Sequence, residues 1–227
     1  SMASAIIGAM LPDIGQMEQL VKNAYTGKFS NPQLTPTVQA GPFTVLELFH
    51  GPTSAFKDVA LCMLPRLLTA AKKEVGVKED ILILTATSGD TGKAAMAGFA
   101  DVPGTKIIVF YPHGGVSNIQ RLQMATQRGA NTYVVAINGN FDDAQTGVKK
   151  IFSDNDAVAY LNDKGYFFSS ANSINWGRLA PQIVYYVSAY CDLLAEGEIK
   201  YGDLLDVTVP TGNFGNILAA YIAKKMG

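Results

Sequence analysis

The chain has 227 residues, of which 48% are hydrophobic and 16% are charged, and its formal net charge at pH 7 is −1. This composition indicates a globular protein with a sizeable core and argues against intrinsic disorder. The balanced charge disfavours a nucleic-acid-binding surface, and no apolar stretch reaches the length of a membrane span. We therefore expect neither a nucleic-acid nor a membrane partner and, without a signal-peptide pattern, a cytoplasmic location.

The first eighty residues predict two helices around an irregular segment. Apolar residues recur at helical spacing over residues 12–26. Three prolines then indicate an extended loop over 32–42, and 43–49 is a strand candidate. A second helix is predicted over 54–74, and Pro65 inside it should kink it or divide it into two.

From residue 80 onwards, short apolar runs alternate with helical segments. The predicted strands cover residues 81–86, 106–111, 132–137, 165–170 and 205–210. The predicted helices end near residues 99, 128, 152 and 194, and a last one follows residue 216. Near-continuous apolar strands between helices predict an α/β fold with a parallel sheet covered by helices on both faces. Because no strand follows the last helix to close a sheet, we expect the sequence to be truncated.

Four unusual loops follow strands of this pattern, where open α/β sheets bind their ligands. They cover residues 50–58, 87–92, 172–176 and 211–216. The last one has two glycines and two asparagines between a strand and a helix, so its backbone can approach a ligand and direct N–H groups at an anion such as phosphate. The alternative is a plain turn with a helix cap.

The loop at 87–92 is a second candidate cradle, for an anion or a carboxylate. Ser88, Asp90 and Thr91 would present hydroxyl and N–H groups at a helix N-terminus. Thr87 and Asp90 have the spacing of a capping box, so a purely structural cap is the alternative. Ser117 and Gln120 are also spaced as a capping box, which we interpret as structural, and Lys93 is predicted to be a solvated lysine on the helix face.

Lys57 lies in the first turn of its predicted helix, after an apolar Ala-Phe pair. A helix N-terminus and partial desolvation both favour a neutral amine, the form that makes a Schiff base. The alternative is a surface lysine whose stem lies along the helix.

Four segments in register, from about residue 11 to 227, make the chain resemble the threonine synthases. They are HGPTSAFKD at 50–58, TATSGDTG at 85–92, SINWGR at 173–178 and GNFGN at 212–216. The resemblance implies a pyridoxal-phosphate (PLP) dependent fold of type II, with parallel-type sheets covered by helices. It implies a small α/β domain over 78–195, and a large domain made of 1–77 and 196–227 and truncated at its C-terminus.

The resemblance also implies a PLP-dependent lyase that converts O-phospho-L-homoserine and water to L-threonine and phosphate in amino-acid biosynthesis. Lys57 would be the catalytic residue, carrying the cofactor and moving protons at the substrate. The phosphate of PLP would be held by Gly212, Asn213, Phe214, Gly215 and Asn216. The substrate would be bound by Ser88, Gly89, Asp90, Thr91, Ser173, Asn175 and Arg178. No motif requires a metal.

Two other functions stay open at this point. One is a threonine-synthase-like phospholyase, and the other is a non-catalytic α/β domain that binds a phosphorylated ligand. A chain ending at residue 227 would also lack the hydroxyl residue that contacts the pyridine nitrogen in this family, so we expect it to bind PLP weakly or not at all. A truncated large domain could expose an apolar face, which would favour a homo-oligomer.

Overall fold

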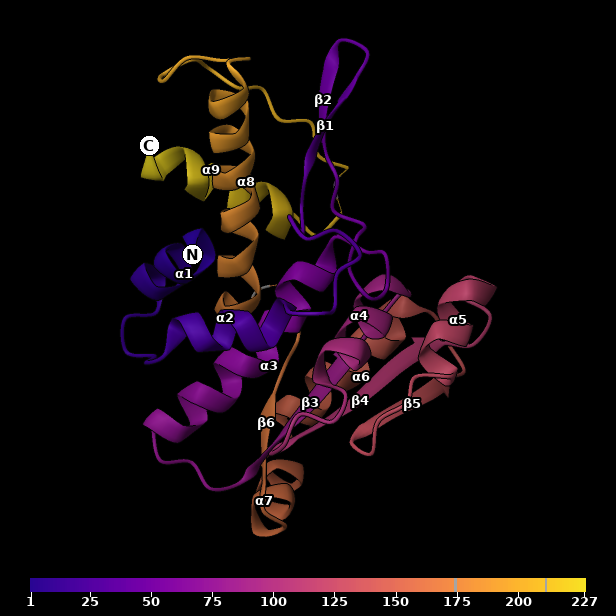
Figure 1. The fold of residues 1–227 in the computed structure, drawn as a ribbon. Coiled ribbons are helices and arrows are strands. Elements are labelled where there is room, and N and C mark those ends of the chain that lie inside the picture. Colours follow the sequence, from indigo (N-terminus) through magenta and orange to yellow (C-terminus); the bar gives the residue numbers. More distant parts are fainter. Residues whose placement is uncertain (174, 211) are drawn as a thin grey trace. The chain divides into compact units, whose positions relative to one another are not determined.

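The computed structural model describes residues 1–173, 175–210 and 212–227 (Figure 1). Ile174 and Thr211, which belong to two of the motifs above, lie outside the described residues. The chain divides into two compact units, one of Ser1–Met63 with Ser173–Gly227 and the other of Leu64–Asn172. The division falls within helix α3 (Lys57–Glu74). Among the described residues, no helix is long and apolar enough to cross a lipid bilayer.

The unit of residues 64–172 is built on a four-stranded parallel sheet with the strand order β5-β4-β3-β6. The strands are β3 (Asp80–Ala86), β4 (Thr105–Pro112), β5 (Thr132–Ile137) and β6 (Tyr166–Ser169). The central strands β3 and β4 pair with Ile83 opposite Ile107. The predicted α/β fold and the first four strands from residue 80 onwards are therefore confirmed.

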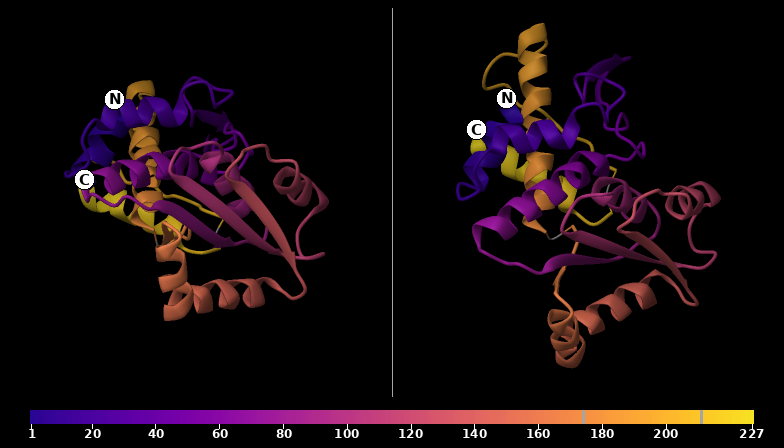
Figure 2. Two further views of the ribbon diagram at one scale, coloured as in Figure 1. Left: turned by 90° about the horizontal axis from the view of Figure 1, so that it is seen from below. Right: turned by 60° about the horizontal axis from the view of Figure 1, so that its bottom comes forward.

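Helices cover both faces of this sheet. Alternate residues of a strand point to opposite faces, and Val148 of α6 (Phe141–Ser153) packs against Leu82 and Leu84 of β3. Helix α6 accordingly runs along one face of the sheet (Figure 2). Helix α4 (Asp90–Phe99) packs on the opposite face, where its Gly92 lies against Val109 of β4. Helices α5 (Asn118–Ala125) and α7 (Asn155–Asp163) and the second part of α3 also belong to this unit. The carboxyl end of β3 thus leads directly into the loop at 87–92.

The other unit is mainly helical. It contains α1 (Met2–Met10), α2 (Met17–Tyr25), α8 (Trp176–Glu196), α9 (Gly215–Met226) and a hairpin of β1 (Thr37–Ala40) and β2 (Phe43–Leu46). Its core joins three helices, because Ile6 of α1, Ile183 of α8 and Ala219 of α9 are buried in one cluster. Helix α9 is therefore held against α8, which fixes the loop at its N-terminus.

Several predicted elements near the N-terminus were wrong in detail. The helix expected over 12–26 is shorter, and α1 precedes it. The segment expected to be an extended loop contributes β1 to a hairpin. Pro65 does not divide α3, which runs without interruption from Lys57 to Glu74. Buried packing of Leu61, Leu64 and Leu67 accounts for this, since tertiary contacts can offset the backbone donor that proline lacks.

The strand expected over 205–210 is absent from the structure, which describes all of these residues. No neighbouring strand among the described residues pairs with the segment, and adjacent Leu204 is 93% exposed. The two compact units also end at other residues than the domains predicted from the sequence, because α8 packs on α1 and α9. The predicted domain boundaries stay a prediction about the whole protein.

Candidate active site

Lys57 is the first residue of α3 and its side chain is half-buried. Its Nζ lies 4.4 Å from the centroid of the Phe56 ring, over the face of that ring. The apolar neighbour predicted from the sequence is thus in contact with the amine. The placement fits a lysine that is presented by a helix start and partly shielded from water.

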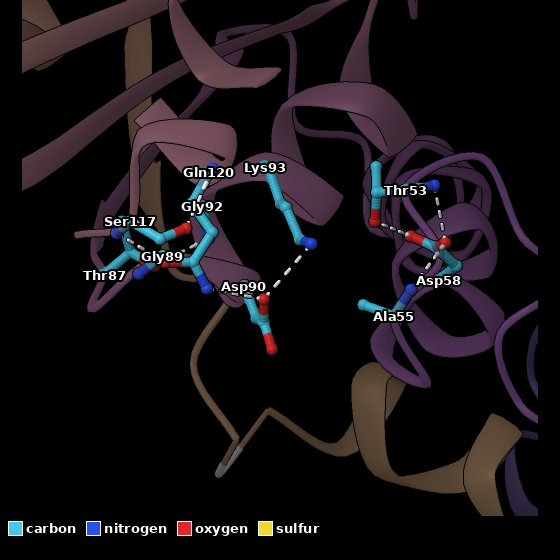
Figure 3. Close-up of polar contacts among 10 residues, drawn as sticks. All are labelled: Thr53, Ala55, Asp58, Thr87, Gly89, Asp90, Gly92, Lys93, Ser117 and Gln120. Carbon is cyan, nitrogen blue, oxygen red and sulfur yellow. Dashed lines mark hydrogen bonds and ion pairs between the residues drawn. The ribbon is translucent and has the colours of Figure 1, made fainter. Parts of the chain in front are cut away.

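The loop before Lys57 is fixed by the carboxylate of the next residue, Asp58, which is 1% exposed. Asp58 Oδ2 accepts a hydrogen bond from Thr53 N at 2.8 Å and another from Ala55 N at 3.4 Å, and its Oδ1 accepts one from Thr53 Oγ1 at 2.6 Å (Figure 3). Hydrogen bonds to a buried carboxylate are among the stronger ones in proteins. They make the backbone that leads into Lys57 rigid.

The glycine–asparagine loop begins α9 with an unusual backbone. Phe214, the residue before the helix, has a φ of +56°, and a Cβ built on Gly215 would lie 3.5 Å from Ser173 Cβ. A Cβ on Gly212 would meet no atom of the described residues within 4 Å. The loop is therefore open at Gly212 and adjoins Ser173 at Gly215, so two of the predicted motifs meet in one place.

Two tyrosines of α8 hold the first turn of α9. Asn216 Oδ1 accepts hydrogen bonds from the hydroxyls of Tyr185, at 3.1 Å, and of Tyr186. Burial raises the pKa of Tyr186 to about 12 and raises the pKa of Tyr185 well above its usual value. Both hydroxyls are thus protonated donors at neutral pH, and they fix the position of Asn216.

The N-terminus of α8 carries the other predicted anion-binding residues. Asn175 caps the helix, because its Oδ1 accepts a hydrogen bond from Gly177 N at 2.9 Å. Arg178 in the first turn is only 5% exposed, and burial lowers its pKa to about 10. The guanidinium stays charged at neutral pH, so a cation lies next to the helix start that carries Ser173 and Asn175.

The loop at 87–92 is organised by one hydroxyl in the unit of residues 64–172. Thr87 Oγ1 accepts hydrogen bonds from Gly89 N and Gly92 N, both at 2.9 Å. The N–H of Thr87 donates to Phe110 O, and Gly89 is the residue before the helix. The capping box predicted for Thr87 and Asp90 is therefore wrong, because the backbone N–H that Asp90 would bind is already used by β4.

Asp90 points instead to two other side chains (Figure 3). Its Oδ1 accepts a hydrogen bond from Gln120 Nε2 at 2.9 Å and lies 3.2 Å from Lys93 Nζ. Lys93 is 9% exposed, so the prediction of a solvated lysine was wrong. The capping box of Ser117 and Gln120 is confirmed, with both of its hydrogen bonds present.

The predicted site residues fall into two sets. Lys57, Ser173, Asn175, Arg178 and the loop at 212–216 belong to one unit, and Ser88 to Thr91 belong to the other. Sequence reasoning missed Asp58, Tyr185 and Tyr186, and it gave Gln120 a structural role only. Asp58 had a signal, since an acidic residue in the first turn of a helix often accepts hydrogen bonds from backbone N–H groups near the helix start, but nothing in the spacing reveals the tyrosine pair.

Comparison with known proteins places this geometry in a family. The family model described as "Pyridoxal-phosphate dependent enzyme" matches residues 29–227. The chain belongs to this family. It is 43% identical to a threonine synthase of Pseudomonas aeruginosa and 42% identical to the human threonine synthase-like 1, over 92% and 93% of its length. These matches cover 42% and 29% of the two relatives, so the chain spans less than half of their length.

A solved structure agrees with this assignment. The crystal structure of PLP-bound threonine synthase from Brucella melitensis matches all of this chain with a TM-score of 0.86 at 40% identity, and the match covers 47% of that protein. The chain therefore has the PLP-dependent type II fold, its family is one of PLP-dependent enzymes, and its cofactor is PLP.

The residues present fit this cofactor. Lys57 supplies an amine at a helix start. The described residues leave open space where a side chain at position 212 would stand, and α9 begins shortly afterwards in the sequence, at Gly215. A loop of this kind suits a phosphate group, because the first N–H groups of a helix have no partner within it.

Proposed function

We propose that the whole protein is a threonine synthase, which converts O-phospho-L-homoserine and water to L-threonine and phosphate. The observation that carries the proposal is the identity of about 40% to threonine synthases along nearly the whole chain, with Lys57 and the loop at 212–216 in one unit. The proposal includes a cytoplasmic location, a homo-oligomeric state, a small domain over 78–195, and a large domain that contains 1–77 and 196–227.

Lys57 is the proposed catalytic residue. PLP, when bound, supplies an electron sink for negative charge at the substrate carbon. The Lys57 amine would hold the cofactor and would take and return protons at Cα and Cβ of the substrate. Phe56 shields the amine on one side, and Asp58 fixes the loop before it, so the position of Nζ is set by the chain itself.

The remaining site residues are proposed to bind anions. Gly212 to Asn216 would hold the cofactor phosphate through backbone N–H groups at the start of α9. Ser88, Gly89, Asp90 and Thr91 would bind the substrate carboxylate at the start of α4. Ser173, Asn175 and Arg178 would bind the substrate phosphate, for which a charged guanidinium is well suited.

The test is borohydride reduction of the PLP-loaded full-length protein, followed by peptide mass spectrometry and by product analysis. We expect a pyridoxyl adduct on Lys57 and L-threonine and phosphate in equimolar amounts. A Lys57→Ala variant should give no adduct and no threonine, whereas Lys149→Ala, at an exposed position of α6, should retain both. An adduct with phosphate release but no threonine would identify a phospholyase, and the lack of any adduct would favour a non-catalytic binding domain.

A further inference from the structure

The proposed carboxylate cradle contains a carboxylate of its own. Ser88 to Thr91 would bind an anion, yet Asp90 in the same loop is itself an acidic residue. Like charges at short distance repel each other, and the repulsion grows as water is excluded. The cradle can accept a substrate carboxylate only if the charge of Asp90 is neutralised or turned away from it.

Two donors converge on one oxygen of Asp90. Gln120 Nε2 donates to Oδ1 at 2.9 Å, and Lys93 Nζ lies 3.2 Å from the same atom (Figure 3). The Lys93 side chain is 10% exposed, whereas that of Asp90 is 46% exposed. A shielded ammonium and an amide thus hold the carboxylate from the side of α4 and α5.

Gln120 has a second bond that fixes its own orientation. Its Oε1 accepts a hydrogen bond from Ser117 N at 3.1 Å, in the capping box of α5. With its oxygen engaged there, the amide group must present its nitrogen to Asp90. Gly89 makes this approach feasible, because a Cβ on Gly89 would lie 2.3 Å from Gln120 Cδ.

We infer that Gln120 is a positioning residue for the loop at 88–91, which together with Lys93 holds Asp90 so that the loop can bind a carboxylate. The cap of α5 is thereby coupled to the substrate site at the start of α4. The inference rests on the proposed function only for the identity of the ligand, since the contacts lie within one unit of the fold.

A Gln120→Glu substitution separates the two roles of this side chain. Glutamate keeps an oxygen for Ser117 N, which preserves the cap of α5, but it cannot donate to Asp90 and adds a second negative charge. The matched control is Asn140→Ala, which removes the cap of α6, where Asn140 Oδ1 accepts from Asp142 N and Asp143 N. That variant loses a helix cap without touching the loop at 88–91.

The first measurement is hydrogen–deuterium exchange of the full-length holoenzyme without substrate. Gln120→Glu should speed exchange in peptides covering residues 88–92, and Asn140→Ala should leave those peptides unchanged.

The second measurement is steady-state kinetics with O-phospho-L-homoserine. Gln120→Glu should raise KM about tenfold with kcat little changed, as expected for loss of a hydrogen bond that acts on substrate binding. Lys93→Met should also speed exchange at residues 88–92 and raise KM. This variant replaces Gln120→Glu in the test if Gln120→Glu does not fold.

Unchanged exchange at 88–92 in Gln120→Glu would overturn the inference, as would an equal effect of Asn140→Ala. If the wild-type protein makes no threonine, the proposed function fails, and the exchange measurement still decides the role of Gln120.

Discussion

Asp58 is the side chain on which the loop before Lys57 depends. It is buried and accepts hydrogen bonds from Thr53 and Ala55. Asp58→Asn replaces an acceptor oxygen by a donor that faces other donors. We expect the free energy of unfolding to fall by about 3 kcal/mol, as is typical for lost hydrogen bonds to a buried charge. Urea unfolding of the full-length protein measures this change.

The control for this prediction is Asp156→Asn, an exposed acid in the first turn of α7. Its loss should cost at most about 1 kcal/mol through the helix dipole. Equal effects of the two substitutions would show that the buried network does not stabilise the loop.

At the residue scale, the sequence predicted where a side chain stands in its helix better than which distant side chain it contacts. Lys57 stands at its helix start as expected, and the Ser117–Gln120 box is formed as expected, because both depend on neighbours within four residues. Lys93 was misjudged, since its burial and its contact with Asp90 depend on how α4 packs on the sheet. Gln120 contacts Asp90 across thirty residues, a pairing that no local pattern contains.

Among the elements, the contact between α8 and α9 makes a testable prediction at high pH. Folding raises the pKa of Tyr186 from 10.0 to about 12, because the hydroxyl is partly buried. Between these values the unfolded chain loses the proton that the folded protein keeps, so stability should decrease as pH rises from about 10 to about 12. Tyr186→Phe should make this decrease shallower in thermal melts recorded across that range.

The same substitution tests whether Tyr186 positions the loop at 212–216, which is proposed to bind the PLP phosphate. Tyr186→Phe removes a donor to Asn216 and keeps the ring, so we expect weaker PLP binding of about three- to tenfold, as for loss of one hydrogen bond. The visible absorption band of the holoenzyme, titrated with PLP, measures it. Tyr160→Phe, on the exposed surface of α7, is the matched control and should bind PLP as the wild type does.

The elements between residues 80 and 170 were predictable, because buried parallel strands give long apolar runs with clear turn signals. Strand β2 was predicted within 43–49, but its hairpin partner β1 was not, since three prolines and exposed side chains conceal its alternation. The apolar run at 205–210 looked like a strand, but an apolar pattern cannot show whether a pairing partner is present.

For the whole chain, exposed apolar side chains predict association. Phe43, Tyr201 and Leu204 are 71%, 88% and 93% exposed, and all belong to the unit that carries Lys57. Large exposed apolar side chains in a soluble sample favour self-association. We expect residues 1–227, expressed alone, to show concentration-dependent association in sedimentation velocity, and Leu204→Lys with Phe43→Lys to reduce it. A strictly monomeric wild-type sample up to high concentration would contradict this.

The packing of the loop at 87–92 restricts which amino-acid substitutions the loop can tolerate. Gly89 has a φ of +134° and adjoins Gln120, and a Cβ on Gly92 would lie 2.5 Å from Thr87 Cγ2 and 2.7 Å from Val109 Cγ1. Ser88, the residue just before Gly89, is exposed. In a library that randomises the loop and is selected for growth, Gly89 and Gly92 should survive only as glycine, while Ser88 accepts other small side chains. New substrate preferences would then have to arise at positions beside the two fixed glycines, such as Ser88, because the glycines themselves could not be exchanged.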